Sequence, residues 1–215
     1  MNELERDLAG ATAAHRALES AIAPLTDERV RMPSLLPDWT VGHVLTHIAR
    51  NADGVRAMLE GALRDEVAPQ YPGGLDQRTA DIEAGAQRDA AAIVADVSLS
   101  NERLEAVWLA MTPAAWAGHG LTVMGEAPCT DLPFRRWRET VVHLADAGLG
   151  YTWNDWPADY RRAELQRMTM LWNSRQPMGL TGLPAAAVAA PEPLRVAWLL
   201  GRADIDGLAP AGLTA

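Results

Sequence analysis

Apolar residues recur at three- and four-residue steps along four long stretches of the chain, which is the pattern of amphipathic helices. In the first stretch these positions include Leu8, Leu18 and Ile22. We predict helices over residues 2–24, 40–63, 76–111 and 131–148. The third is long for a single helix, and we place any bend in it near residues 98–101.

Residues with capping and turn preferences mark where these helices begin and end. Thr40 is the candidate N-cap of the second helix, and Thr130 or Asp131 that of the fourth. Gly148 is a good C-terminal stop for the fourth helix. The segment DEVAPQYPGGLDQ interrupts the chain with two prolines and two glycines, and residues 112–130 look irregular or short-stranded. Four helices joined in this way predict a four-helix bundle.

The last part of the chain differs in composition. A helix-like run at residues 157–173 precedes a segment rich in Gly, Pro and Ala. We predict two domains, a bundle over residues 1–151 and a small C-terminal α+β domain of mixed helix and short strand over residues 152–215. A unit this small buries little core of its own, so we expect it to pack on the bundle.

Charge and composition limit the classes of partner. The chain has 215 residues and a net charge of −9, which argues against nucleic-acid binding. No apolar run approaches the ~20 residues of a membrane-spanning helix, and the N-terminus lacks the apolar region of a secretory signal. We therefore expect a cytoplasmic monomer or homodimer that acts on small molecules, without a nucleic-acid or membrane partner.

The chain has a single cysteine, Cys129. An intramolecular disulfide is impossible, which fits a reducing compartment. The acidic residues of EAPCTDLP would raise the pKa of this thiol, so we do not expect Cys129 to be a nucleophile. A reaction that uses a thiol would need one from outside the chain.

Two helical segments place candidate metal ligands four residues apart. In WTVGHVLTHIARNADG these are His43 and His47, and in RWRETVVHLADAG they are Glu139 and His143. Residues at this spacing share one helix face and lie within ~6 Å of each other. A catalytic zinc usually takes three protein ligands, and a bundle can supply the third from a facing helix.

Ordinary explanations compete with a metal site. Glu139 and His143 share their stripe with Arg136 and Asp146, as on the solvated face of an amphipathic helix. His43 and His47 lie among apolar residues, and a buried histidine is more often a hydrogen-bonded core residue. The other two histidines, His15 and His119, have no partner nearby in the sequence, and we interpret them as structural.

The two motifs together resemble a known family. LPDWTVGHVLTHIARNADG, followed about ninety residues later by RWRETVVHLADAG, is similar to the mycothiol-dependent maleylpyruvate isomerases of the DinB-like bundle superfamily. The tail AWLLGRADIDGL resembles the end of that family's small C-terminal domain. The resemblance spans nearly the whole chain, and its first motif is long and specific. It implies a mainly α fold, a DinB-like four-helix bundle with a small C-terminal α+β domain.

The resemblance also implies a metal site. It assigns a divalent ion, zinc before others, to the positions of His47, Glu139 and His143. His43 then becomes a packing or second-shell residue, a choice that spacing alone does not make. Asp146 matches an acidic position of the second motif that could orient a ligand. The family often carries a histidine where this chain has Leu144, a departure that leaves the ligand set intact.

The implied reaction is the cis–trans isomerisation of maleylpyruvate to fumarylpyruvate with mycothiol or another low-molecular-weight thiol. A zinc ion binds sulfur well and keeps it as thiolate near neutral pH. The thiolate adds to the double bond, the resulting single bond rotates, and elimination restores the thiol. The dianionic substrate needs cations, for which Arg202, in the family-like tail, is the first candidate and Arg50 the second.

Three other functions stay open. A thiol S-transferase would use the same metal and thiol on a different electrophile and release the adduct. A non-catalytic metal-binding stress-response bundle would normally close its site with four ligands, often cysteines, and this chain has one cysteine. Metal-assisted hydrolysis ranks low, because Glu139 is used as a ligand and no second carboxylate is evident as a base.

Overall fold

The protein is described by a computed structural model that covers residues 1–175 and 182–213 of the chain. Residues 1–149 and 150–215 form two compact units, and each is described by itself. The division lies two residues before the predicted boundary. Among the described residues, no helix combines the length and apolar content that a membrane span requires.

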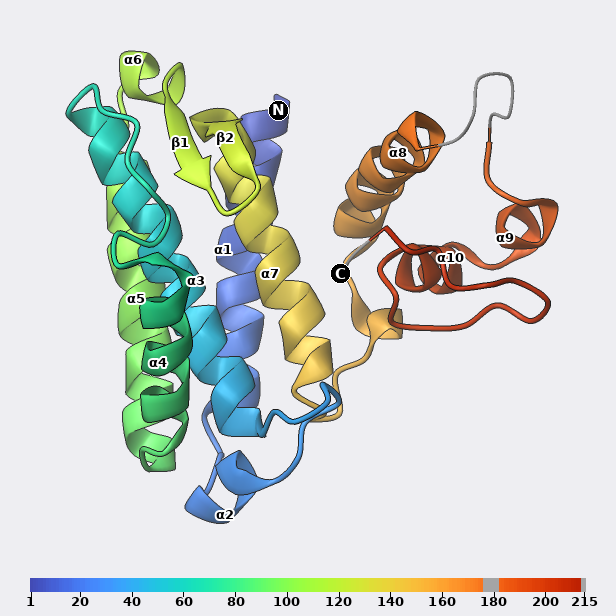
Figure 1. Ribbon diagram of the computed structural model, residues 1–215, viewed down its shortest axis with the longest axis horizontal. Helices are drawn as coiled ribbons and strands as arrows, with labels where there is room; N and C mark the ends of the chain where they lie inside the picture. Colours follow the sequence, from blue (N-terminus) through green and yellow to red (C-terminus); the bar gives the residue numbers. More distant parts are fainter. Residues whose placement is uncertain (176–181, 214–215) are drawn as a thin grey trace. The chain divides into compact units, whose positions relative to one another are not determined.

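The first unit is a four-helix bundle, as the sequence predicts (Figure 1). Its four long helices are α1 (Glu3–Ile22), α3 (Val41–Leu63), α5 (Ala90–Ala110) and α7 (Leu132–Asp146). Helix α3 packs against α5 and α7, and α1 packs against the same two helices. The shorter elements are α2 (Asp27–Arg31), α4 (Gly74–Ala86), α6 (Pro113–Trp116) and the 3₁₀ turn η1 (Cys129–Asp131).

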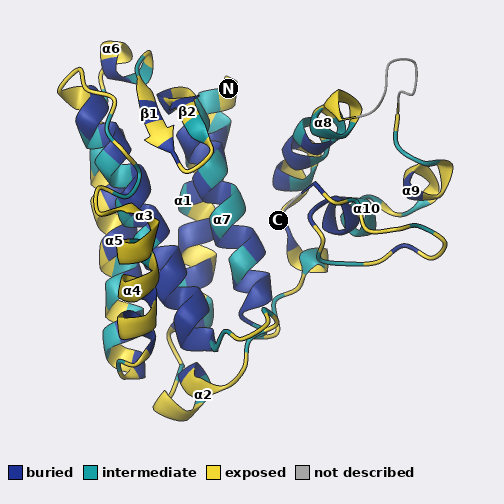
Figure 2. Cartoon of the chain, in the orientation of Figure 1, coloured by how far each residue is buried: buried dark blue, intermediate teal, exposed yellow. Residues whose placement is uncertain are grey.

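Helix α3 lies at the centre of this packing and is buried along most of its length (Figure 2). It begins at the predicted residue, because the Thr40 hydroxyl accepts a hydrogen bond from the backbone N–H of His43 while the His43 ring Nδ1 accepts one from the backbone N–H of Thr40. Helix α7 ends as expected, with Gly148 at a φ of 67°, a conformation that costs glycine little. At Gly10, a Cβ would lie 2.5 Å from the Trp137 ring, so α1 and α7 approach closely there.

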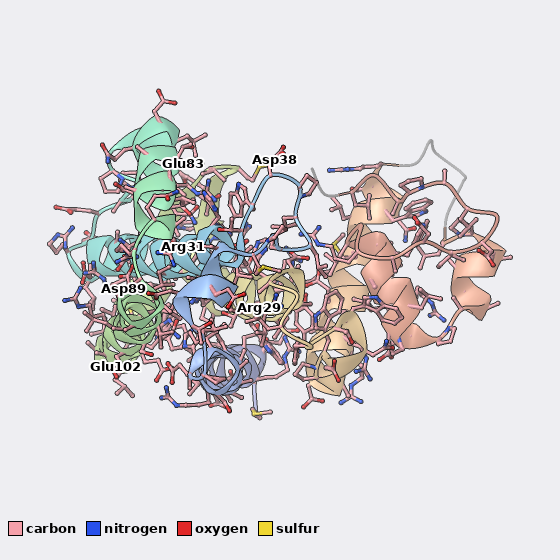
Figure 3. The ribbon with its side chains drawn as sticks, turned by 90° about the horizontal axis from the view of Figure 1, so that it is seen from below. Arg29, Arg31, Asp38, Glu83, Asp89 and Glu102 are labelled. Carbon is pink, nitrogen blue, oxygen red and sulfur yellow. The ribbon has the colours of Figure 1, made fainter. Side chains whose placement is uncertain are left out.

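The predicted helix over residues 76–111 is in fact two helices. Helix α4 ends at Ala86 and α5 begins at Ala90, so the break lies at residues 87–89 and not near residues 98–101. Asp89, labelled in Figure 3, is the cause: its side chain accepts a hydrogen bond from the backbone N–H of Ala92 and starts a new helix. Apolar spacing continues across the break, which is why the periodicity alone did not reveal it.

A β-hairpin fills part of the connection between α6 and η1. Strand β1 (His119–Thr122) pairs antiparallel with β2 (Gly125–Pro128). The hairpin also holds the loop that follows α3, because Gln70 donates its backbone N–H to the Leu121 carbonyl at 2.8 Å. The short-stranded reading of residues 112–130 is therefore confirmed, and the hairpin fixes the loop that carries Tyr71.

In the second unit the described elements are helical. They are η2 (Trp153–Asp155), α8 (Ala158–Ser174), α9 (Ala185–Ala189) and α10 (Glu192–Leu199). The short strand expected here is not found in residues 150–175 or 182–213; the two strands of the structure belong to the bundle unit. Pro184 and Pro191 directly precede α9 and α10, and the alanines of α9 favour helix over strand. The expectation that this unit packs on the bundle stays a prediction.

A buried arginine crosses the core of the bundle. Arg136 is fully buried on α7. Its Nε donates to His15 Nε2 at 3.0 Å, and its Nη1 donates to the Ile48 carbonyl and to Asn51 Oδ1, both at 2.9 Å. Its Nη2 donates to Asn101 Oδ1 at 2.8 Å. These bonds tie α7 to α1, α3 and α5, and burial lowers the Arg136 pKa to about 10.

His15 is held neutral by this network. Arginine can only donate, so His15 Nε2 must accept, and Nδ1 carries the proton that it shares with Glu105 at 2.8 Å. Burial is the main reason that the His15 pKa falls from 6.5 to about 4, and the Arg136 charge adds to it. Between pH 4 and pH 6.5, His15 is therefore protonated in the unfolded chain and neutral in the folded chain.

We expect the free energy of unfolding to fall as the pH drops from 6.5 towards 4, because protonation of His15 favours the unfolded chain in that window. One such group costs about 1.4 kcal/mol per pH unit, or about 3 kcal/mol over the window. Urea titrations of the original protein and of His15→Gln at several pH values measure this pH dependence of the free energy of unfolding. Glutamine can still accept from Arg136 but does not titrate, so equal pH slopes in the two proteins would contradict this role of His15.

Candidate metal centre

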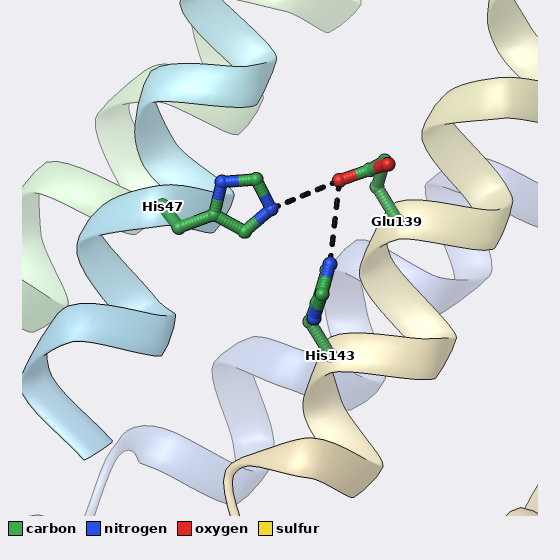
Figure 4. Close-up of side chains that lie close together, drawn as sticks. All are labelled: His47, Glu139 and His143. Atoms are coloured by element: carbon green, nitrogen blue, oxygen red, sulfur yellow. Dashed lines mark hydrogen bonds and ion pairs between the residues drawn. The ribbon is translucent and has the colours of Figure 1, made fainter. Parts of the chain in front are cut away.

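Three candidate ligands from two helices meet in the bundle (Figure 4). His47 lies in the N-terminal third of α3, and Glu139 and His143 lie one turn apart on α7, which packs against α3. Glu139 Oε2 is 3.0 Å from His47 Nε2 and 3.5 Å from His143 Nε2. One donor atom from each residue lies within 4.8 Å of the other two. Spacing within α7 provides two of the donors, and helix packing provides the third.

This donor set fits a divalent transition metal. Two imidazole nitrogens and one carboxylate form a three-ligand zinc site of the kind that leaves a position open. Among the described residues, the cluster holds three groups of the His, Cys, Asp and Glu types. Cys129 is buried in η1 outside it, and burial raises the pKa of its thiol. A closed four-ligand structural site is therefore not formed by these residue types.

The stripe that carries Glu139 and His143 is not a solvated face. The neighbouring residues of the same stripe, Arg136 and Asp146, are 0% and 4% exposed. Arg136 is turned into the core, and Asp146 Oδ2 lies 2.9 Å from His143 Nδ1. The interpretation as an exposed polar stripe is thus wrong, because Arg136 and Glu139 contact polar groups on other helices and Asp146 is paired with His143 of α7 itself.

Asp146 sets the orientation of His143. Its contact with Nδ1 leaves Nε2 directed towards Glu139, the arrangement in which second-shell carboxylates orient metal-bound histidines. Burial opposes the charge on His143, but the hydrogen bonds that its ring donates to Asp146 and Glu139 outweigh this effect and raise its pKa to about 9. An ion that takes Nε2 must therefore displace a proton at neutral pH.

The pKa values of Glu139 and His47 are lowered, whereas that of His143 is raised. Burial would raise the pKa of the Glu139 carboxyl, but hydrogen bonds from His143 and His47 hold it well below its ordinary value. The pKa of His47 is lowered, first by burial and then by the nearby charge of His143. A carboxylate that stays ionised and an imidazole that stays neutral are the forms that ligate metals.

His43 does not join the cluster. Its Nδ1 is bonded to Thr40, 2.7 Å from the hydroxyl, and its Nε2 lies 3.3 Å from Glu83 on α4. The His43 ring stacks on Trp39, and Trp39 also contacts the His47 ring at 5.6 Å between centroids. His43 therefore caps α3 and packs behind His47.

A cavity of about 540 Å³ reaches His47 and Glu139. Its polar walls include Tyr71, Arg78, Arg135 and Arg138. Its apolar walls include Val55, Met58, Leu75 and Leu132. Arg135 and Arg138 precede Glu139 by four residues and one residue in the motif FRRWRET, so their spacing on α7 could have identified them. Tyr71 lies in the loop after α3 and Arg78 on α4, and their sequence neighbourhoods gave no signal.

Of the two arginines predicted to bind substrate, Arg50 belongs to the bundle unit and Arg202 to the second unit. Arg50 Nη2 pairs with Asp96 at 2.6 Å and Asp53 at 3.0 Å, and it lines a second cavity of about 260 Å³. Arg202 follows α10 in the second unit, where its Nη1 donates to the Leu200 carbonyl at 2.9 Å. Arg50 does not line the cavity at the cluster, and the substrate roles of Arg50 and Arg202 stay predictions.

Comparisons with solved structures identify proteins that share this fold. A crystal structure described as the mycothiol-dependent maleylpyruvate isomerase shares 25% sequence identity and a TM-score of 0.82, covering 94% of this chain and 90% of that one. A structure of a mutant of that isomerase shares the fold at 24% identity and a TM-score of 0.81, with the same coverage. A comparison with curated proteins found no match.

The family comparison covers the bundle and both motifs. The model of the mycothiol maleylpyruvate isomerase N-terminal domain matches residues 11–148, which include the three clustered residues. This match extends over more than half of the 215 residues. The chain therefore belongs to the mycothiol maleylpyruvate isomerase N-terminal domain family.

Proposed function

We propose that this protein is a metal- and thiol-dependent isomerase that converts maleylpyruvate to fumarylpyruvate. The observation that carries the proposal is the His47, Glu139 and His143 cluster beside a cavity lined by arginines. Family membership supports the thiol, with mycothiol as the first candidate. When bound, a zinc ion would supply a Lewis acid that keeps an incoming thiol as thiolate at neutral pH.

The residues of the chain would hold the ion and its surroundings. His47, Glu139 and His143 supply the donor atoms, and Asp146 keeps the His143 ring in place. Three protein ligands leave room for a sulfur ligand from solution. Cys129 is buried, which supports a thiol that comes from outside the chain.

The arginines of the cavity suit a dianionic substrate. Arg78, Arg135 and Arg138 line the same cavity as Glu139, and guanidinium groups bind carboxylates through paired hydrogen bonds. The thiolate adds to one alkene carbon, and the electron pair moves onto the adjacent carbonyl oxygen as an enolate. Cations near that oxygen stabilise the enolate. The carbon–carbon bond then rotates, and loss of the thiolate leaves the trans alkene.

Proton NMR of the zinc-loaded protein with mycothiol and maleylpyruvate tests the reaction. We expect fumarylpyruvate to form while the thiol is recovered unchanged, because addition and elimination cancel. Omission of the thiol should stop conversion, and parallel samples with glutathione identify which thiol is used. Zinc-loaded protein that leaves maleylpyruvate unchanged with every thiol would contradict the isomerase.

A thiol S-transferase is the second candidate, and one observation favours it. Val55, Met58, Leu75 and Leu132 give the cavity an apolar side, which suits an electrophile less charged than maleylpyruvate. The same cluster and thiol would serve, but the adduct would leave without elimination. Mass spectrometry of the same mixtures, with neutral electrophiles added, separates the two: a stable conjugate supports the transferase.

A further inference from the structure

The His47 ring has a hydrogen-bond partner at each nitrogen. Arg78 Nη2 lies 2.8 Å from Nδ1, and Glu139 Oε2 lies 3.0 Å from Nε2. Turning the ring over would direct carbon atoms at both partners, so its orientation is defined. A guanidinium group only donates. His47 Nδ1 must therefore accept from Arg78, and Nε2 carries the proton that is donated to Glu139.

This tautomer conflicts with metal coordination through Nε2. A nitrogen that binds an ion gives up its lone pair, so a neutral ring carries its proton on the other nitrogen. That proton on Nδ1 would point at an N–H of Arg78, donor against donor. His143 has no such conflict, because Asp146 is the partner of its Nδ1. Of the two histidines, His47 alone has a donor behind its ligating nitrogen.

We propose that Arg78 leaves His47 when a divalent ion binds and then serves the cavity as an anion-binding cation. The inference rests on the metal site of the proposed function. The His47 proton moves from Nε2 to Nδ1 through solvent, so the ring stays neutral and releases no net proton. Arg78 is already a wall residue of the cavity and keeps a second contact, with its guanidinium carbon 5.4 Å from the centre of the Tyr71 ring.

Two effects favour the movement of Arg78 away from His47 when the ion binds. The Nδ1 hydrogen bond is lost when the tautomer changes, and the ion adds positive charge near the guanidinium. A carboxylate in the cavity would replace His47 Nδ1 as the hydrogen-bond acceptor of Arg78. By linkage, metal binding then strengthens anion binding, and an anion strengthens metal binding by the same factor.

Nitrogen NMR of protein labelled with ¹⁵N-histidine is the main test, with zinc ions as the only probe. Without zinc, we expect His47 Nδ1 to be unprotonated and Nε2 protonated; with one equivalent of zinc, the assignment should reverse. Arg78→Gln removes the donor and offers a carbonyl acceptor to Nδ1. We expect it to bind zinc about tenfold more tightly in competition with a chelator, since a hydrogen bond from a charged donor no longer has to be broken.

Two variants control for charge. Arg78→Lys keeps a cation that can only donate, so its zinc affinity should stay within about twofold of the original. Arg56→Met removes a cation from the neighbouring cavity, where Arg56 pairs with Glu60 at 2.7 Å, and should also change affinity less than about twofold.

Each outcome decides the proposal. Zinc bound through His47 Nε2 while Nδ1 stays unprotonated and bonded to Arg78 would overturn it but leave the metal site intact. An equal gain in affinity for Arg78→Gln and Arg56→Met would overturn it as well, because charge alone would then be responsible. Failure of His47 to bind zinc at all would remove the metal site, and with it both this inference and the proposed function.

Discussion

Alanine in place of Glu139 or His47 is expected to abolish metal binding. We expect the original protein to hold about one zinc ion per chain and each variant to hold only a trace, because two remaining ligands do not form a stable site. Glu139 has the larger effect, since its Oε2 is within 3.5 Å of both histidine nitrogens and it supplies the negative charge of the cluster. Metal analysis after equilibration with zinc and gel filtration measures the change.

The control for this experiment is His119→Ala. His119 is an exposed histidine of β1 and lies outside the cluster, so its loss should leave the metal content unchanged. Circular dichroism checks that the variants keep their helices. Full metal content in either Glu139→Ala or His47→Ala would remove that residue from the ligand set. Thiol-dependent conversion of maleylpyruvate should disappear together with the metal.

Arg136→Met is expected to destabilise the bundle unit by about 3–5 kcal/mol, the cost of breaking a buried network that contains a charge. Four acceptors lose their donor: His15, Ile48, Asn51 and Asn101. Methionine fills part of the space but offers no hydrogen bond, so these groups stay buried without compensation. Urea denaturation followed by circular dichroism measures the free energy of unfolding.

Arg103→Met provides the comparison, because Arg103 is exposed on α5. It should change the free energy of unfolding by less than about 0.5 kcal/mol. A similar small change for Arg136→Met would mean that its four bonds contribute little beyond those that water supplies to the unfolded chain. The network also joins α7 to α3, so we expect partial loss of zinc affinity in Arg136→Met even under conditions where it is folded.

Local features of the sequence were enough for the main helices. Thr40 begins α3 and Gly148 ends α7 as expected, since caps and stops act within a few residues. The break between α4 and α5 was missed, because Asp89 is one capping residue in a segment whose apolar spacing continues on both sides. The strand expected in residues 152–215 was not found in the described part of that unit, where proline followed by alanine favours short helices.

The candidate site could be predicted only in part. The four-residue spacing of Glu139 and His143 follows from helix geometry, but periodicity placed them on a solvated stripe. The choice of His47 over His43 came from the family resemblance, and the structure supplies its physical reason: His43 is used in the cap of α3. Arg78 and Tyr71 reach the cavity from α4 and from a loop held by β1, contacts that no local pattern encodes.

The sequence by itself determined the long helices of the bundle apart from the break before α5, the caps at Thr40 and Gly148, and two candidate ligands on one face of α7, because each depends on neighbours within about four residues. Only the tertiary structure decided that His47 faces Glu139, that Arg136 is buried, and that Arg78 donates to His47. These contacts join residues 31 to 121 positions apart. They are fixed by how α1, α3, α4 and α7 pack, and packing depends on the shapes of whole helix faces rather than on any short segment.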